Sequence, residues 1–294
     1  MRLLARFTRI SAALILTSGY CFAQTAPPGP NVGKPPVTAT PAVNPQESVL
    51  LANLYMQTSA EYAAVCLQTY SLALERLKTK LAARAVGDLK PAVVMDLDET
   101  VIDNSGFQSF IDREKLNYSD ALWDVWEKSY PDEVRLIPGA KAFIAGAENL
   151  GVTVVYLSNR LTKNSAGTAS ALTRLGLNTE GLTDRLLLKE AGGSSDKTAR
   201  RKSADQKYLI LMYFGDNLRD FSEEFAAPKL AETDDAGQLK AIAERRAKVD
   251  RAAYRWGNDW IILPNPVYGE WQKLLGKDPR TKLNKTRMTV PAAK

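Results

Sequence analysis

The sequence contains no histidine. This absence excludes every mechanism that needs an imidazole, such as the Ser-His-Asp triad, a histidine nucleophile or a histidine-ligated zinc ion. Acid–base or nucleophilic chemistry in this chain must therefore come from carboxylates, lysines, hydroxyl groups or a bound metal ion.

Cysteine is also scarce, because Cys21 and Cys66 are the only two in the chain. Cys21 lies in an N-terminal segment that we expect to be removed. Cys66 would then be the single cysteine left and would have no partner for an internal disulfide. We expect Cys66 to pack as a small apolar side chain.

Residues 1–23 have the three parts of a secretory signal peptide. Three arginines and no acidic residue precede an apolar run too short to span a membrane, and small residues at the end form a cleavage site. Cleavage would lower the formal charge from +6 to +3, which weakens any charge-based argument for binding a nucleic acid polymer. The sequence predicts export across the inner membrane to the periplasm. Lipidation of Cys21, giving a tethered outer-membrane lipoprotein, is the alternative.

The rest of the chain divides by composition. Residues 24–46 are rich in proline and predict a disordered leader, and residues 276–294 predict a basic, solvated tail. Between them we expect one domain, residues 47–275. Its expected parts are N-terminal helices over 47–87, an α/β core over 91–102 and 138–275, and an aromatic-rich insert over 103–137.

The N-terminal helical region has a capping pattern and an apolar stripe. Thr58 and Glu61 form a T-x-x-E pattern that predicts a helix start, and Gly87 predicts its end. Three-four spacing then predicts one buried face. The expected face consists of Ala60, Ala63, Leu67, Tyr70, Leu74, Leu77 and Leu81.

Five short apolar runs predict the strands of the core. Each run is continuous rather than alternating, which is typical of strands buried on both faces, and helical patterns lie between most of them. This alternation predicts an α/β fold with a doubly wound parallel sheet and a smaller helical cap from the insert. The runs cover residues 92–97, 152–157, 185–188, 208–214 and 260–263.

Polar residues follow three of these predicted strands. Asp96 and Asp98 end the first, Ser158 follows the second, and Asp216 follows the fourth with Asp220 one helical turn later. Because ligands bind at the carboxyl ends of parallel strands, we expect these groups to converge. Paired carboxylates suit magnesium, although D-x-D pairs also hold metal in nucleotide-sugar transferases and also occur as solvated turns.

The order of the motifs carries more information than any one of them. A strand followed by D-x-D-x-T, a strand followed by serine, a lysine, and a strand followed by G-D-x-x-x-D resembles the haloacid dehalogenase superfamily. Within it, "DLDETVIDNS", "SNR", "GDNLRDF", "QTSAEY" and "LPNPVYG" are similar to the class C bacterial acid phosphatases, which include lipoprotein 5′-nucleotidases. The resemblance covers roughly residues 45–275 and implies a Rossmann-like core of that superfamily.

The resemblance also implies residue roles. Asp96 would attack phosphorus and form an aspartyl-phosphate, and Asp98 would act as general acid and then as base, with its backbone carbonyl on the metal. Lys197 would neutralise phosphate charge, although Lys189 and Lys202 also fit the motif. The remaining implied roles are substrate contacts by Thr100, Ser158 and Asn159, magnesium ligation by Asp96, Asp98 and Asp216, and support by Asp220.

The insert is dense in aromatic residues, and this density allows two interpretations. The aromatic rings form the core of a helical subdomain, or one or two of them, such as Trp126, stack on a substrate ring together with Tyr268. We therefore predict a magnesium-dependent acid phosphatase that hydrolyses small phosphomonoesters, with nucleoside 5′-monophosphates or nicotinamide mononucleotide among them. A metal-dependent D-x-D glycosyltransferase and a non-catalytic periplasmic binding module are the alternatives.

Overall fold

The computed structural model describes residues 45–284. The predicted signal peptide, Cys21, the leader up to residue 44 and the last ten residues of the basic tail lie outside the described residues. Among the described helices, none is both long and apolar enough to cross a membrane.

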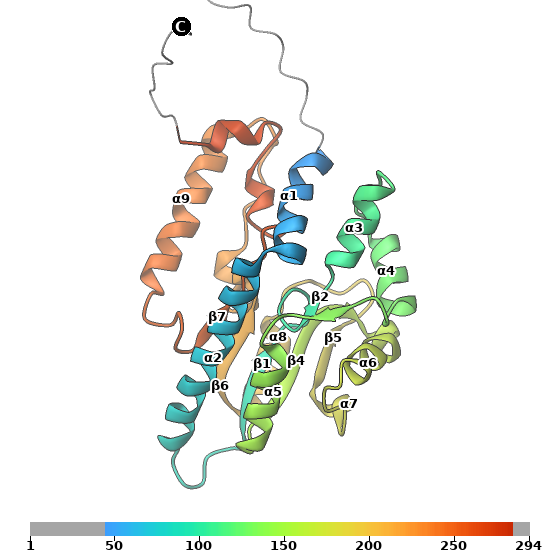
Figure 1. Cartoon of the computed structure of the whole chain (residues 1–294). Helices are drawn as coiled ribbons and strands as arrows, with labels where there is room; N and C mark the ends of the chain where they lie inside the picture. Colours follow the sequence, from blue (N-terminus) through green and yellow to red (C-terminus); the bar gives the residue numbers. More distant parts are fainter. Residues whose placement is uncertain (1–44, 285–294) are drawn as a thin grey trace, which may run out of the picture. The chain divides into compact units, whose positions relative to one another are not determined.

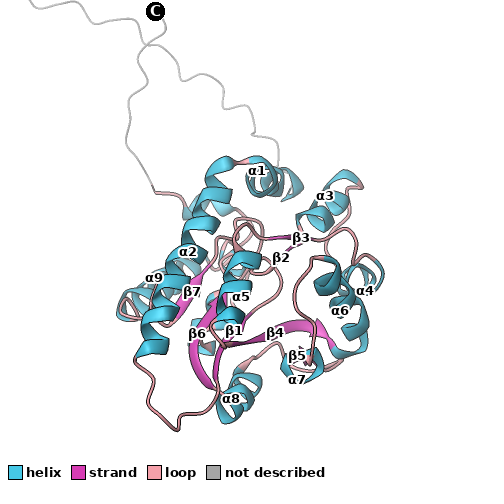
Figure 2. Ribbon diagram, turned by 60° about the horizontal axis from the view of Figure 1, so that its bottom comes forward, coloured by secondary structure: helices cyan, strands magenta, loops and turns pink. Residues whose placement is uncertain are grey.

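The core is a sheet of five parallel strands (Figures 1 and 2). Each predicted apolar run forms one of them, and the strand order β5-β4-β1-β6-β7 shows that the chain winds outward in both directions from β1. The doubly wound parallel sheet predicted from the sequence is therefore confirmed. The strands are β1 (Pro91–Met95), β4 (Thr153–Leu161), β5 (Leu186–Lys189), β6 (Leu209–Gly215) and β7 (Trp260–Ile262).

Helices cover both faces of this sheet. Figures 1 and 2 show α2 and α5 on one face and α8 on the other. Alternate residues of β1 point to opposite faces of the sheet. Val93 and Met95 belong to the larger hydrophobic cluster of the core. Ala92 and Val94 belong to a smaller cluster, which also contains Ala204 of α8. The helices of the core are α1 (Pro45–Thr58), α2 (Ala60–Ala82), α5 (Ala140–Asn149), α6 (Ser165–Arg174), α7 (Leu182–Arg185), α8 (Thr198–Lys207) and α9 (Asp235–Arg251). Short 3-10 helices are η1 (Thr162–Asn164), η2 (Leu218–Asp220), η3 (Glu223–Phe225), η4 (Gln272–Leu274) and η5 (Pro279–Lys282).

Helix α2 differs from its sequence prediction in start, end and buried face. Its N-cap is Ser59, whose hydroxyl accepts a hydrogen bond from the Tyr62 amide at 3.1 Å, and the helix ends at Ala82, before Gly87. Leu67 is exposed, because the face that docks on the sheet is turned to one side of the predicted stripe. The buried face consists of Tyr62, Cys66, Tyr70, Ala73 and Leu77, which confirms the apolar role of Cys66.

The insert forms a helical cap on a short antiparallel ribbon. Strands β2 (Ile102–Asp103) and β3 (Arg135–Leu136) pair with each other, and between them lie α3 (Ser105–Arg113) and α4 (Asp120–Ser129) (Figure 1). Two-residue strands are too short to show an alternating pattern, so the sequence did not predict the ribbon. Helix α1 supports α3, since Asn53 Nδ2 donates to Ser109 Oγ at 2.9 Å.

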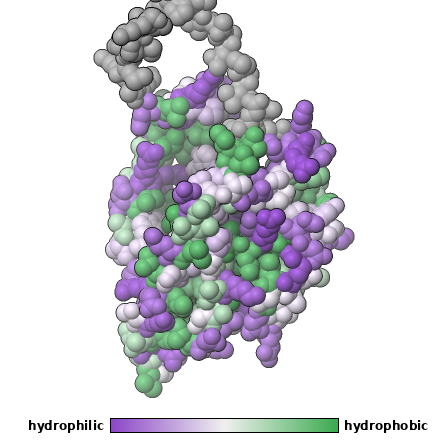
Figure 3. Space-filling view, viewed as in Figure 1, coloured by the Kyte–Doolittle hydropathy of each residue, from purple (hydrophilic) through white to green (hydrophobic). Residues whose placement is uncertain are grey.

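The outer side of α1 is apolar. Figure 3 shows apolar side chains gathered over this helix, where Leu50, Leu51, Leu54 and Tyr55 are exposed. Val49 and Ala52 pack instead against the core cluster. Helix α1 therefore has apolar side chains on both its inner and its outer face.

The prediction of a solvated tail from residue 276 holds in part, since most of the described residues 276–284 are exposed, although η5 contacts the domain. Helix η5 packs near the start of α9, where the Lys282 ammonium pairs with Asp235 and Thr281 Oγ1 donates to Asp235 Oδ1 at 3.1 Å. A basic segment alone did not indicate that an acidic helix N-terminus would hold it.

Candidate active site

Polar side chains meet in one cavity beyond the carboxyl ends of the strands. The cavity has a volume of about 940 Å³, within the range of small-molecule sites. Asp96 and Asp98 reach it from the loop after β1, Asn159 from β4, and Asp216 from the loop after β6, with Lys197 beside them. The predicted convergence of these groups at one edge of the sheet is therefore present in the structure.

Lys197 is the cation at the centre of this group. Its ammonium donates hydrogen bonds to Asp96, to Asp220 Oδ1 at 2.7 Å and to the Leu157 carbonyl at 2.9 Å, and the residue is only 3% exposed. Of the three lysines that fit the motif, Lys197 is the one that contacts Asp96. Lys189 lines the cavity elsewhere, and Lys202 is exposed on α8.

Three carboxylates form the acidic part of the site. Asp96, Asp216 and Asp220 each place an oxygen within 4.8 Å of the others. Burial raises the pKa of Asp96 to about 7, with Lys197 opposing the rise and Asp220 adding to it. Burial, followed by the charges of Asp220 and Asp96, also raises the pKa of Asp216 well above its ordinary value. One lysine does not balance these three neighbouring carboxylates, and their hard oxygen donors fit a divalent cation such as Mg²⁺.

The structure of the segment after β6 explains why the G-D-x-x-x-D motif begins with a glycine, Gly215. A Cβ atom on Gly215 would lie 2.4 Å from Asp220 Cβ, so the Asp220 side chain could not pass so closely over any other residue. Asp220 Oδ2 accepts a hydrogen bond from the Asn217 amide at 3.0 Å, which closes the capping box of η2. Asp216 is held by Asn265, whose Nδ2 donates to Asp216 Oδ2 at 2.8 Å.

The two aspartates of the D-x-D motif have different partners. Asp98 is not part of the three-carboxylate group. Its Oδ1 accepts hydrogen bonds from Arg160 Nε at 2.8 Å and Asn104 Nδ2 at 3.0 Å, and its Oδ2 accepts one from Ser158 Oγ at 3.3 Å. The motif therefore supplies one carboxylate to the Lys197 cluster and a second, separately held carboxylate to the same cavity.

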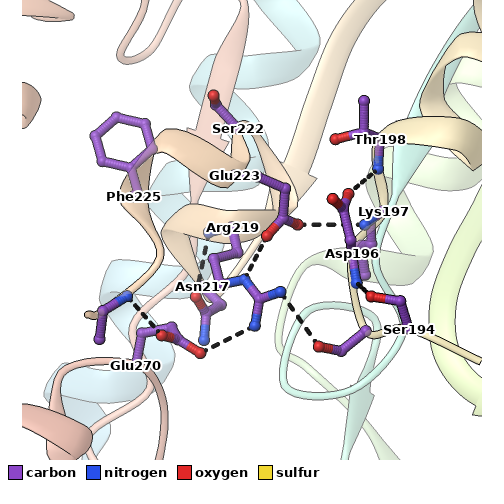
Figure 4. Close-up of polar contacts among 12 residues, drawn as sticks. Ser194, Asp196, Lys197, Thr198, Asn217, Arg219, Ser222, Glu223, Phe225 and Glu270 are labelled. Carbon is purple, nitrogen blue, oxygen red and sulfur yellow. Dashed lines mark hydrogen bonds and ion pairs between the residues drawn. The ribbon is translucent and has the colours of Figure 1, made fainter. Parts of the chain in front are cut away.

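A second arginine ties the Lys197 loop to the segment after β6 (Figure 4). Arg219 donates to Glu223 Oε2 at 2.7 Å, to Glu270 Oε1 at 3.1 Å and to Ser195 Oγ at 3.2 Å. Glu223 Oε1 in turn accepts a hydrogen bond from the backbone amide of Lys197 at 3.2 Å. The position of Lys197 thus depends on a network that the sequence analysis did not identify, although Arg219 lies within the quoted "GDNLRDF".

Three of the predicted substrate contacts, Thr100, Trp126 and Ser158, do not line the cavity. Thr100 is fully buried, and its hydroxyl has no hydrogen-bond partner in the described structure, while its carbonyl accepts a hydrogen bond from Tyr70. Trp126 is 8% exposed, stacks on Tyr130 and donates from Nε1 to Asn104 Oδ1 at 2.9 Å. The side chains of Thr100 and Trp126 face the interior, and the structure does not support substrate contacts from either.

Other residues occupy the wall. Asn159 and Tyr268 line the cavity as predicted, and Trp123 and Tyr118 of the cap also line it. Ser158 is fully buried behind Asp98. Aromatic density identified the cap, but Trp123 and Trp126 are three residues apart on α4, and only the docking of that helix decides which one meets the cavity.

The fold and the site together define a class of protein. A doubly wound parallel sheet that presents two aspartates after β1, a buried lysine and two aspartates after β6 has the arrangement of a haloacid dehalogenase-type phosphatase. The sequence profile of the HAD superfamily, subfamily IIIB (acid phosphatase), matches residues 9–271. The chain belongs to this family of acid phosphatases.

Solved structures agree with this assignment. The class C acid phosphatase from Bacillus anthracis with tungstate bound is 30% identical, with a TM-score of 0.67 over 82% of this chain and 92% of that one. Another structure of the Bacillus anthracis class C acid phosphatase is 31% identical, with a TM-score of 0.67 over 79% of this chain and 89% of that one. The chain is thus a phosphoric monoester hydrolase of the class C acid phosphatase type, which removes the glycosyltransferase and non-catalytic alternatives.

Proposed function

We propose that this acid phosphatase depends on magnesium and hydrolyses small phosphomonoesters through an aspartyl-phosphate on Asp96. The observation that carries the proposal is the placement of Asp96 within hydrogen-bond reach of Lys197, beside two further carboxylates, in a cavity that Asp98 also lines. Phosphoryl transfer needs alignment and positive charge around the phosphate oxygens, and little other chemistry.

The residues present account for both half-reactions. The Asp96 carboxylate attacks phosphorus as the bond to the alcohol oxygen breaks, and Asp98 gives that oxygen a proton. A water then attacks the aspartyl-phosphate, Asp98 takes its proton, and the Asp96 carboxylate is released with inorganic phosphate. Lys197 neutralises charge on the phosphate throughout.

Asp96, Asp216 and Asp220 fit the ion that the family resemblance implies. Bound magnesium would supply positive charge to the phosphate oxygens and would relieve the repulsion among these buried carboxylates. The Asp98 side chain is held by Arg160, and the family resemblance implies that the backbone carbonyl of Asp98 would also contact the ion.

Removal of the metal tests this proposal. Phosphate release from p-nitrophenyl phosphate and from a nucleoside 5′-monophosphate, measured between about pH 5 and 7, is expected to fall by at least about 100-fold on chelation, because removing one preorganised source of positive charge costs about that much. Added Mg²⁺ should restore the rate, and Ca²⁺, which is larger and less strict in geometry, should not. Full turnover after exhaustive chelation would contradict the magnesium proposal.

We also propose that the substrates carry an aromatic ring, as nucleoside 5′-monophosphates and nicotinamide mononucleotide do. Trp123 and Tyr118 of the cap and Tyr268 of the segment after β7 line the cavity, and aromatic faces bind bases by stacking. These walls belong to the same cavity as Asp96, so a ring and a phosphate of one molecule can occupy it together.

Trp123 provides the test of substrate class. Trp123→Ala is expected to raise the KM for a nucleoside 5′-monophosphate about 10-fold, since loss of one stacking contact costs about 1–3 kcal/mol, and to change the KM for glycerol phosphate little. Tyr254→Ala, at an exposed tyrosine outside the cavity, is the matched control. Equal rises for both substrates would assign Trp123 to cap packing alone.

Export remains a prediction from residues 1–23, which lie outside the described structure. The tripartite pattern supports a periplasmic enzyme, and lipidation of Cys21 remains the alternative that would tether it to the outer membrane.

A further inference from the structure

We propose that Arg160 is a positioning residue for Asp98, and that with Asn104 it occupies Oδ1 of this carboxylate and leaves Oδ2 to transfer the proton. This inference rests on the proposed function, in which Asp98 is the general acid and base. It adds which oxygen of Asp98 acts and what holds it in place.

The two oxygens of Asp98 are bound unequally. Arg160 Nε donates to Oδ1 at 2.8 Å, Arg160 Nη2 lies 2.8 Å from the same oxygen, and Asn104 Nδ2 donates to it at 3.0 Å. Oδ2 has one long hydrogen bond, from Ser158 Oγ at 3.3 Å. A carboxylate oxygen has about two lone pairs, so three donors saturate Oδ1 and leave Oδ2 available for a reacting proton.

Arg160 is itself held rigidly. It is 2% exposed, its Nη2 donates to Asn104 Oδ1 at 3.0 Å, and its guanidinium lies 5.9 Å from the centre of the Trp123 ring. Burial works against its charge, but the facing carboxylates of Asp98, Glu127 and Glu99 raise the pKa of Arg160, so it stays a cation. A planar guanidinium fixed in this way sets the rotation of the Asp98 carboxylate.

The same contacts join Asp98 to the cap. Asn104 precedes α3, and its Oδ1 also accepts the Trp126 indole N–H at 2.9 Å. Trp123 and Trp126 both lie on α4. Arg160 therefore links the loop after β1, the end of β4 and the cap helix that lines the substrate cavity.

The chemistry assigned to Oδ2 balances in both half-reactions. Oδ2 gives its proton to the ester oxygen while the bond from that oxygen to phosphorus breaks and the bond from Asp96 to phosphorus forms. It then takes a proton from water while the water oxygen bonds to phosphorus and the Asp96 carboxylate leaves. A misrotated Asp98 would lower the rate of the first half-reaction only for alcohols that are too basic to leave as anions.

Leaving-group dependence tests this inference. In Arg160→Met, kcat/KM for glycerol phosphate is expected to fall about 100-fold, the lower part of the range for lost general acid catalysis, and kcat/KM for p-nitrophenyl phosphate less than about 5-fold. For p-nitrophenyl phosphate, kcat and KM should fall together, because the attack of water on the aspartyl-phosphate still needs Oδ2 and becomes slow. Acid quenching should then trap the phosphoenzyme. Arg160→Lys, which keeps the charge and loses the planar fork, should fall between Arg160→Met and the wild type.

Two comparison variants separate the possible failures. Asp98→Asn must show the same dependence on leaving group, and if it does not, the proposed role of Asp98 is wrong. Arg185→Lys is the control for a buried arginine, because Arg185 donates to backbone carbonyls, such as that of Val154 at 3.2 Å, and does not line the cavity. Arg185→Lys should lower the melting temperature, and any change that it causes in kcat/KM should be the same for both substrates.

The inference is overturned if Asp98→Asn discriminates between the two substrates and Arg160→Met lowers kcat/KM equally for both. If Arg160→Met does not fold, as judged by circular dichroism, Arg160→Lys and Asn104→Leu carry the test, since each changes the donors to Oδ1 and keeps the Ser158 donor to Oδ2. Equal losses on both substrates in these two variants would overturn it in the same way.

Discussion

Asp96→Asn is expected to lower phosphate release by roughly 10⁴-fold or more while the protein stays folded, because an amide nitrogen or oxygen cannot replace the carboxylate nucleophile. Initial rates on p-nitrophenyl phosphate measure the loss, and acid quenching followed by mass spectrometry measures the phosphoenzyme. Wild-type enzyme should carry one phosphoryl group during turnover and the variant none. Wild-type turnover in Asp96→Asn would end the assignment of Asp96 as nucleophile.

The same variant should change how stability depends on pH. The pKa of Asp96 is about 7 in the folded protein without metal and 3.8 as an ordinary carboxyl, so between these pH values the folded state binds more protons than the unfolded state. The stability of the wild type should then fall as the pH rises from about 4 to 7, and this fall should be smaller in Asp96→Asn. Urea unfolding in chelator at pH 5 and pH 7 measures it.

A matched control removes general charge effects. Asp250→Asn changes an exposed aspartate of α9 and should keep both the turnover and the pH dependence of the wild type. Identical pH dependence in the wild type and Asp96→Asn would show that Asp96 ionises in the folded protein as an ordinary carboxyl does.

The strands and their polar ends could be predicted because each depends on local sequence. A strand buried on both faces needs a continuous apolar run, and the carboxyl ends of parallel strands must share an edge, so the sequence predicts that Asp96 and Asp216 lie near each other. Three lysines fit the same role in the sequence, because Lys189 and Lys202 lie close to Lys197. Only the fold decides which of them reaches Asp96.

The features that were missed depend on tertiary docking. Arg160 was quoted within "SNR", but nothing near it in sequence indicates a partner 62 residues earlier. The face of α2 was predicted one position away from the one that docks, because Leu67 and Cys66 both fit a helical period. Tyr70 belongs to both faces and stacks on Phe214 of β6 with ring centroids 5.9 Å apart, whereas Cys66 is fully buried and Leu67 is exposed.

The turn directly after the D-x-D motif was also beyond the sequence pattern. Glu99 has a φ of 55°, and its buried Oε1 accepts a hydrogen bond from the backbone amide of Asn104 at 2.9 Å. A left-handed residue here is unfavourable for a glutamate and is retained because this hydrogen bond fixes the loop that follows Asp98 and leads to Asn104. The D-x-D spacing predicts an extended pair, whereas the structure holds the two carboxylates with different partners.

Lys197→Met should have the second large effect, on turnover and stability together. Loss of the ammonium removes positive charge from the phosphate, which is expected to lower kcat about 10²–10³-fold. It also leaves Asp96 and Asp220 buried without their cation, which is expected to cost about 3–5 kcal/mol of folding free energy without metal. Phosphate release and urea unfolding measure the two effects separately.

A second substitution distinguishes the two roles of Lys197. In Lys197→Met/Asp220→Asn one of the unpaired carboxylates becomes neutral, so part of the lost stability should return, while kcat should stay low because the phosphate still lacks its cation. Lys282→Met, at another well-buried lysine that pairs with Asp235 outside the cavity, should change kcat less than about 2-fold, as is usual for a substitution away from the site. If kcat returned with stability in the double variant, Lys197 would act by holding the fold, and the positive charge at the phosphate would have to come from the metal alone.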